Sequence, residues 1–321
     1  MMLSRLHIEL LLAGLTIPGA GAVCGQDYPV KTIRIITSEP GGGPDLAARL
    51  VAPVASSYLG QPMIVDNRSG GGSIYGGIVA KAAPDGYTLL VTGNAFWIGP
   101  LMRAASYDPV KDFSAVSLLF NAPNIVVMHP SLPIKSIREL IELARRRPGE
   151  LNFASSTIGS SPHLAAELFK AMAGVNIVHI PYKSGGAAAI NLIGGQIEFA
   201  FATAASVAPY IKSGRVKALA VTSAKPTALA PGLPTVSASG LPGYESVSTI
   251  GMFAPARTPM TIINRINQEV VRAVTTADVK EKFFNAGVEA AGSTPEEFSA
   301  RVYSDVVQIG KLIKDAGIRA D

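Results

Sequence analysis

The sequence has a single cysteine, Cys24, so no disulfide can form within one chain. Charged residues are also scarce, at 16% of the chain, and the formal net charge is +5. The densest basic run, residues 145–147, lies at the end of an expected helix, where cations complement the helix dipole. This is not the clustered basic surface that binds nucleic acid, so we expect no nucleic-acid partner.

The common catalytic motifs are missing too. No Gly-x-Ser-x-Gly, Gly-Lys-Ser/Thr or His-Glu-x-x-His occurs, which removes the usual nucleophile elbow, phosphate loop and zinc site. His129 and His179 stand at expected strand ends among apolar residues, a setting typical of structural imidazoles. Ser160 or Ser161 with His163 stays open as a hydrolase alternative, but we find no orienting acid beside His163. We therefore expect no enzyme, no metal and no cofactor.

Residues 1–22 have the pattern of a secretory signal peptide. A start that includes Arg5 leads into an apolar run over residues 10–17 and then into small residues ending at Ala22. This run is too short to span a bilayer, so cleavage after about Ala22 would release a soluble, exported chain. Lipidation of Cys24 stays open as an alternative, although Val23 precedes it where a lipid-attachment site has a small residue.

Short apolar runs alternate with helical patterns along the rest of the chain, which predicts an α/β fold with mostly parallel sheets. The expected strands span residues 32–37, 63–65, 87–91, 125–128, 151–154, 177–180, 197–201, 218–221 and 250–254. The expected helices span residues 46–58, 73–82, 137–146, 162–173, 187–193, 259–275 and 279–285, and one more precedes residue 214. Capping boxes at Ser136 and Thr294 open two helices, the second of them the last in the chain, and Ser161 is the expected N-cap before Pro162.

A glycine loop stands where the first strand gives way to the first helix. Gly41, Gly42 and Gly43 have no side chains, so their N–H groups can approach a bound group closely, and the helix that opens near Asp45 favours an anion there. We interpret the loop as a cradle for a small anion; the alternative is an ordinary connection. The loop over residues 155–161 holds the same place in the second half of the chain, which suggests two lobes facing across a cleft.

Eight short motifs follow one another after the expected signal peptide. Each alone is weak evidence, but their order and spacing together are specific. In chain order they are Pro40-Gly-Gly-x-x-Asp45-x-x-Ala48-Arg49, Gly60-Gln-Pro62, Asp66-Asn-Arg-x-Gly-x-Gly72, Ala83-Pro-Asp-Gly-Tyr-Thr-Leu89, Tyr107-Asp-Pro-x-Lys-Asp-Phe113, Ser160-Ser-x-His-Leu-Ala-x-Glu-Leu-Phe169, Pro181-Tyr-Lys-x-Gly185 and Leu192-x-Gly-Gly-Gln196.

This set of motifs resembles the Bug family, the periplasmic solute-binding proteins of tripartite tricarboxylate transporters. The resemblance implies a two-lobed clamshell of the type II periplasmic binding proteins. Lobe one would comprise residues 23–122 and 249–321, and lobe two residues 123–248. It also implies a monomer that captures a small carboxylate and delivers it to membrane permease subunits. A partner of the outer domain of a membrane sensor is the alternative.

In that family the glycine loop grips one carboxylate and loops of the second lobe hold the rest of the solute. Carried onto this chain, the resemblance implies ligand binding by Gly41, Gly42, Gly43, Asp45, Thr92, Gly93, Asn94, Ser155, Ser156, Thr157, Ser160, Ser161, His163, Tyr182, Lys183 and Gly185.

The chain departs from the family pattern at Glu39, Ala202, Ala238 and Thr249. Many relatives have Asp at the position of Ala202, where a carboxylate would meet a ligand amino or hydroxyl group. Trp97, the only tryptophan, follows the third expected strand, where the cleft is expected. It would either form an apolar wall, favouring a ligand with a hydrophobic or aromatic body, or pack into lobe one.

Overall fold

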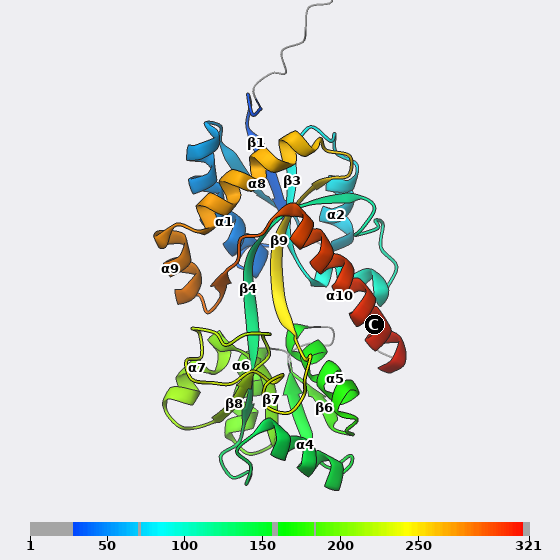
Figure 1. Cartoon of the computed structure of the whole chain (residues 1–321), viewed down its shortest axis with the longest axis vertical. Coiled ribbons are helices and arrows are strands. Elements are labelled where there is room, and N and C mark those ends of the chain that lie inside the picture. The colour runs from blue at the N-terminus through cyan, green and yellow to red at the C-terminus, as the bar shows by residue number, and fades with distance from the viewer. Residues whose placement is uncertain (1–27, 70–71, 156–159, 183, 317–321) are drawn as a thin grey trace, which may run out of the picture.

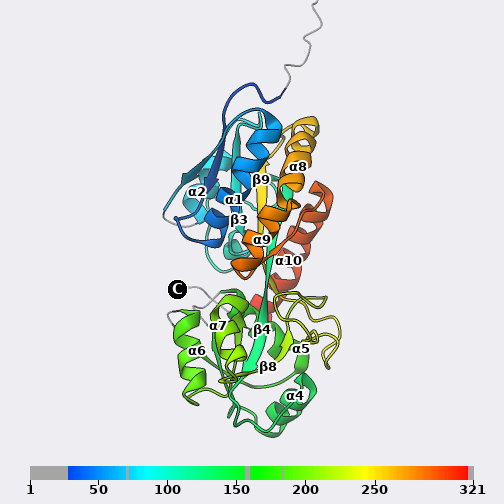
Figure 2. The same cartoon turned by 90° about the vertical axis from the view of Figure 1, so that its left-hand side faces the viewer.

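The computed structural model describes residues 28–69, 72–155, 160–182 and 184–316. Figure 1 shows an upper and a lower half joined by two long strands, β4 (Phe113–Met128) and β9 (Val247–Pro255). Helices cover both faces of the strands in each half, as the perpendicular view in Figure 2 also shows. The α/β fold expected from the sequence is confirmed.

The upper half contains strands in the order β2 (Met63–Asn67), β1 (Ile33–Thr37), β3 (Thr88–Gly93), β9 and β4. The first three are parallel, whereas β9 runs antiparallel to both β3 and β4. A short strand, β10 (Glu289–Ala290), pairs with the other edge of β4.

The lower half contains strands in the order β4, β7 (Phe199–Thr203), β5 (Asn152–Ser155) and β6 (Val178–Pro181), and β8 (Lys217–Val221) also pairs with β4. β5, β6 and β7 are parallel, but β4 is antiparallel to β7 and β8. The sheets are therefore mixed rather than mostly parallel, because the strands that cross between the halves run against their neighbours.

Four clusters of buried side chains hold helices to the two faces of the strands. In the upper half, α1, α8 and α9 pack on one face and α2, α3 and α10 on the other. In the lower half, α4 and α5 pack on one face and α6 and α7 on the other. The helices are α1 (Gly43–Leu59), α2 (Gly72–Ala80), α3 (Ala95–Ile98), α4 (Ile137–Arg146), α5 (Ser161–Ala173), α6 (Gly185–Ile193), α7 (Ala204–Lys212), α8 (Met260–Val274), α9 (Ala277–Asn285) and α10 (Pro295–Ala316), and a 3₁₀ turn spans Gly99–Leu101.

Side-chain caps open several of these helices. Ser136 accepts a hydrogen bond from the Glu139 N–H, and Thr294 and Glu297 exchange side-chain to backbone bonds of 3.1 and 2.9 Å. The prediction for α5 was wrong by one residue, because Ser160 and not Ser161 is its N-cap. This shift frees the Ser161 hydroxyl for another contact.

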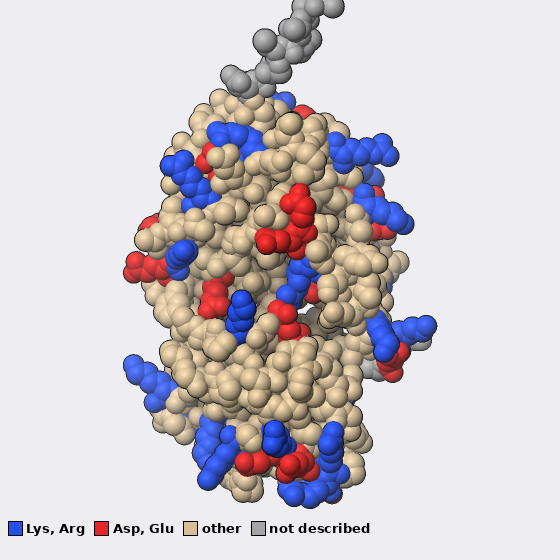
Figure 3. All heavy atoms as spheres, in the orientation of Figure 1, with Lys and Arg blue, Asp and Glu red and all other residues tan. Residues whose placement is uncertain are grey.

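Within the residues that the structure describes, no helix is both long and apolar enough to cross a membrane. The expected signal peptide and Cys24 lie outside those residues. Figure 3 shows acidic and basic side chains intermixed on the face viewed, which agrees with the thinly spread charge of the sequence.

Candidate ligand-binding site

The carboxyl ends of the parallel strands in the two halves point toward each other. β1 and β3 end at Thr37 and Gly93 in the upper half, and β5, β6 and β7 end at Ser155, Pro181 and Thr203 in the lower half. Figure 1 shows both sets of ends near the middle of the molecule, where β4 and β9 pass. Ligands of open α/β sheets bind beyond such strand ends, so this junction is the candidate site.

The glycine loop connects β1 to α1 with no side chain over the helix start. Gly42 is the N-cap, with extended φ and ψ of −82° and 169°, and no side chain caps α1. Gly41 has φ +83°, which favours glycine. A Cβ atom on Gly43 would lie 3.3 Å from the Phe120 ring of β4, so the loop sits against a crossing strand. The N-cap position of α1 is thus without a side chain that would occupy the anion-binding end of the helix.

Asp45, in the first turn of α1, is hydrogen-bonded to this loop. Its buried carboxylate accepts hydrogen bonds from the Gly41 N–H, from Asn67 Nδ2 and from Arg49 Nε, at 2.8 to 2.9 Å. Burial would raise the pKa of this carboxyl, but the three donors outweigh burial and lower the pKa. Asp45 therefore stays charged and braces the loop, and these contacts give it a positioning role.

The second upper loop follows β3. Thr92 is buried, and its hydroxyl lies 3.4 Å from the Tyr75 hydroxyl. Gly93 packs against β9, because a Cβ atom there would lie 2.7 Å from the Ile250 side chain. Asn94 bridges to β9 as well: its N–H donates to the Thr249 carbonyl and its Nδ2 to the Val247 carbonyl, at 2.9 and 3.2 Å.

In the lower half, Ser155 lies at the end of β5 with its hydroxyl 2.7 Å from His179 Nε2. His163 is buried in the first turn of α5, and its ring centroid is 4.3 Å from that of His179. Burial lowers the pKa of both imidazoles, that of His179 to about 4. The predicted absence of an acid near His163 was wrong, since Glu167 Oε1 lies 3.9 Å from its Nε2, one turn further along α5.

Ser160 and Ser161 have different contacts. The Ser160 hydroxyl accepts from the His163 backbone N–H at 3.5 Å as the helix cap. The Ser161 hydroxyl accepts from Asn124 Nδ2 on β4 at 2.9 Å. Ser161 thus ties the start of α5 to a crossing strand.

The other lower candidates lie beyond β6. The Tyr182 N–H donates to the Ser155 carbonyl at 3.1 Å, and Gly185 is the first residue of α6 behind the cap Ser184. Ser156, Thr157 and Lys183 lie outside the described residues. The described candidates thus lie at strand ends and helix starts of the two halves: Gly42 and Asn94 in the upper half, and Ser155, Ser161 and Gly185 in the lower half.

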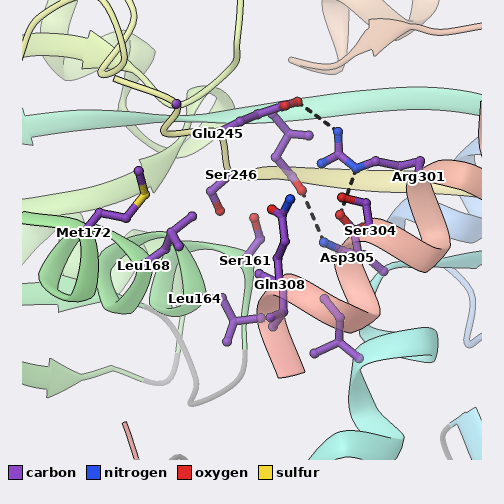
Figure 4. Close-up of a pocket in the computed structure, with 15 residues that line it drawn as sticks. Ser161, Leu164, Leu168, Met172, Glu245, Ser246, Arg301, Ser304, Asp305 and Gln308 are labelled. Carbon is purple, nitrogen blue, oxygen red and sulfur yellow. Dashed lines mark hydrogen bonds and ion pairs between the residues drawn. The ribbon is translucent and has the colours of Figure 1, made fainter. Parts of the chain in front are cut away.

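A cavity of about 210 Å³ lies on one side of this junction, between α5 and α10. Asn94 from the upper half and Ser161 from the lower half both line it. Figure 4 shows Arg301 of α10 between Glu245 and Asp305, with apolar side chains of α5 on the opposite wall. Arg301 pairs with both carboxylates at 2.9 Å, and the pair with Glu245 joins α10 to the segment that precedes β9.

Trp97 does not line this junction. The indole is fully buried against Phe253 and Phe298, and its Nε1–H donates to Asp305 at 3.0 Å. The apolar wall expected from Trp97 was therefore wrong, and packing into the upper half is correct. Sequence position alone could not decide this, because the aromatic cluster includes residues more than 150 positions away.

The sequence analysis also missed polar residues on the crossing strands. Asn124 is fully buried, and among the described residues its Oδ1 has no hydrogen-bond partner. Thr249 Oγ1 donates to Asn121 Oδ1 at 3.1 Å. The signal was present as asparagines beside an apolar run, but the expected strand began only at residue 125, after both of them. Within the described residues, no group of three metal-ligating side chains occurs.

A model of the family described as "Tripartite tricarboxylate transporter family receptor" (TctC) matches residues 47–318. The chain belongs to this family. Protein BugT of Bordetella pertussis (strain Tohama I) is 31% identical to this TctC-family chain over 323 residues, which cover 99% of this chain and 98% of BugT. The Bug resemblance found in the motifs is confirmed.

Solved structures of similar proteins have the same fold. R. palustris Rpa4515 with adipate is 34% identical, with a TM-score of 0.71 over 91% of this chain and 99% of that one. The periplasmic binding protein BugD is 30% identical, with a TM-score of 0.68 over 92% and 100%. A TctC solute-binding protein from Polaromonas with no ligand is 26% identical, with a TM-score of 0.84 over 90% and 99%. The TctC family is thus one of periplasmic solute-binding receptors with a two-lobed fold.

Proposed function

We propose that this chain is an exported receptor that captures a small carboxylate between its two halves. It then presents the carboxylate to the membrane permease of a tripartite tricarboxylate-type transporter. The family assignment supports the transport role, and the adipate bound to the 34% identical relative supports the carboxylate. The pattern of residues 1–22 supports export.

The observation that carries this proposal is the uncapped glycine start of α1 at the junction. Gly42 offers its backbone N–H at the positive end of a 17-residue helix, and no side chain caps that end. The Asp45 carboxylate in the first turn is already bound by three donors, one of them the Gly41 N–H. A ligand carboxylate can therefore take the open end of the helix.

The strand pairing supports a division of the chain into two lobes. We propose residues 23–122 and 249–321 as lobe one and 123–248 as lobe two, since β4 and β9 are the strands that belong to both halves. The TM-score is higher for the Polaromonas structure without ligand than for the adipate complex, although its identity is lower. This difference supports an open arrangement of the described structure that closes on a ligand.

We propose that no bond is made or broken at the site. The two serines of the hydrolase alternative act as a helix cap and as a bridge to β4. Ser155 and His179 form a serine–histidine hydrogen bond beside the hydrolase candidates, but Ser155 is only 1% exposed. A binding role uses these hydroxyls as donors, which needs no activated nucleophile.

Two measurements test this function. Mass spectrometry of the protein purified from the periplasm should find a bound carboxylate in a one-to-one complex with a monomer. Cells that lack the chain should then lose uptake of that acid. A folded protein that binds no carboxylate would overturn the proposal. Normal uptake with an altered transcriptional response would instead support a partner of a membrane sensor.

A further inference from the structure

A second cavity lies inside the lower half, between β7 and the helices α6 and α7, and has a volume of about 110 Å³. We call it the α6 cavity. It is separate from the cavity beside α10 and shares none of the charged side chains there. Its buried, apolar lining includes Ala188, Ala189, Leu192, Ala200, Ala202 and Val207.

The alternation of side chains along β7 explains the open space. Phe199 and Phe201 point to the face covered by α4 and α5, whereas Ala200 and Ala202 point to the face covered by α6 and α7. The methyl side chains of these two alanines leave room below α6. The side chains that line an apolar void of this size lack van der Waals contacts that larger side chains would supply.

The edge of the α6 cavity lies at the strand ends of the lower half. Its deep residues are buried, with Ala202 6% and Leu192 0% exposed, whereas Gly185 and Thr203 at its edge are half-buried. Gly185 begins α6 and Thr203 ends β7, so this edge lies among the strand ends of the lower half. A ligand held at the junction can therefore extend into the cavity.

We propose that the α6 cavity takes the hydrocarbon tail of the bound carboxylate, an inference that rests on the proposed function. Apolar cavities of about 150 Å³ accommodate benzene, so 110 Å³ accommodates about four or five carbon atoms of a chain. The ligand class is then a monocarboxylate of about six carbons, such as hexanoate.

The lining also discriminates against more polar acids. A second carboxylate at the end of the tail, as in adipate, would be buried among alanines and leucine, and none of the described lining residues carries a charge. Hydroxyl groups along the tail, as in malate, would likewise lose their hydrogen bonds to water. The chain should therefore bind hexanoate more tightly than either diacid.

Calorimetric titration of the mature chain with propionate, butyrate, hexanoate and octanoate tests the tail length. Affinity should rise about threefold to fourfold per added methylene up to about six carbons, because each buried methylene contributes a fixed hydrophobic increment. Octanoate should bind no more tightly than hexanoate, because a six-carbon acid already fills the cavity. Adipate and malate should bind more weakly than hexanoate.

Variants that fill the cavity make the test specific. Ala202→Val on β7 and Ala189→Leu on α6 each add bulk to the lining, and each should weaken hexanoate binding more than tenfold while leaving propionate within twofold. Ala220→Val is the matched control, because Ala220 is equally buried on β8 and lies outside the lining. Thermal denaturation of each variant identifies those that are folded. If one filling variant does not fold, the other still tests the cavity.

The outcomes separate this inference from the proposed function. Binding that does not depend on tail length, or hexanoate affinity unchanged in the filled variants, overturns the tail site and leaves a carboxylate receptor. A wild-type protein that binds none of the six acids, nor any other carboxylate, overturns both. A steep rise to hexanoate that both filled variants abolish supports the tail site.

Discussion

At the scale of single residues, the site depends on backbone groups at Gly42. A Cβ atom there would have its nearest neighbours at 3.7 Å, an ordinary contact distance, and the φ of −82° suits any residue. Gly42→Val should therefore fold, but its side chain should block a carboxylate from the start of α1. We expect affinity to fall more than tenfold, or about 1.4 kcal/mol.

Titration calorimetry of Gly42→Val beside Gly99→Val checks this prediction. Gly99 has open space around it and lies outside the glycine loop, so its variant should bind like the wild type. Equal affinity in a folded Gly42→Val protein would exclude the anion cradle.

The buried imidazoles make stability depend on pH. Burial, the neighbouring His163 and Lys170 lower the pKa of His179 from 6.5 to about 4, so the folded protein resists protonation that the unfolded chain accepts. A depressed pKa contributes stability above pH 6.5 that is lost as the pH falls toward 4. In urea unfolding, the free energy of unfolding of His179→Phe should fall less between pH 6.5 and pH 4 than that of the wild type. Phe at this position keeps the stacking on Phe153.

His129→Phe is the control for that experiment, because His129 lies outside the cluster and bonds to Ser131. An identical pH dependence in wild type and His179→Phe would show that another group is responsible. The Glu167 carboxylate, which favours protonated His163, opposes the effect and reduces its size.

Residue-level reasoning placed the glycine loop correctly between a strand and a helix, because three glycines after an apolar run leave few alternatives. It failed for Trp97, whose surroundings come from β9 and α10. It also overlooked Glu167, although a position four residues after His163 on a helix is a neighbour.

At the scale of elements, the hydrogen bonds of Asp45 link the glycine loop, α1 and β2. Asp45→Ala removes the acceptor for Gly41, Arg49 and Asn67 together. Buried hydrogen bonds to a charged group contribute about 1.5–3 kcal/mol each, so we expect a stability loss of about 2 kcal/mol or more. Ligand affinity should fall as well, because the loop loses its fixed position.

Urea unfolding and calorimetry of Asp45→Ala measure both effects. Asp85→Ala is the control, because Asp85 is half-exposed and its ion pair with Lys31 is long, at 3.8 Å. Wild-type stability and affinity in Asp45→Ala would contradict the bracing role.

The long crossing strand β4 is the element that the sequence did not reveal. The pattern predicted a strand only at residues 125–128, because Asn121, Pro123 and Asn124 interrupt the apolar run. In the structure Pro123 pairs with Val247 of β9, so long-range pairing overrides the local signal. Helices with caps were predicted far better, and α4 matches at both ends because capping is a local interaction.

At the scale of the whole molecule, the ion pair between Glu245 and Arg301 joins the lower end of β9 to α10. In the open arrangement proposed above, this pair stabilises the open form against closure. Glu245→Gln should then raise ligand affinity about twofold to fivefold, since partly exposed pairs contribute up to about 1 kcal/mol. Arg301 would keep its bond to Asp305.

Calorimetry of Glu245→Gln and of Glu150→Gln tests this coupling. Glu150 pairs with Arg147 inside the lower half, so its loss should not affect closure. Unchanged or weaker binding in Glu245→Gln would contradict a role of the pair in holding the halves apart.

The central claim is that one carboxylate is held by both halves at once. Small-angle X-ray scattering of the mature protein, before and after saturation with an acid that calorimetry shows to bind, tests it most directly. Closure around the ligand should reduce the radius of gyration, and Gly42→Val at the same acid concentration should keep the larger value. The same radius of gyration with and without the bound acid would contradict capture between the halves.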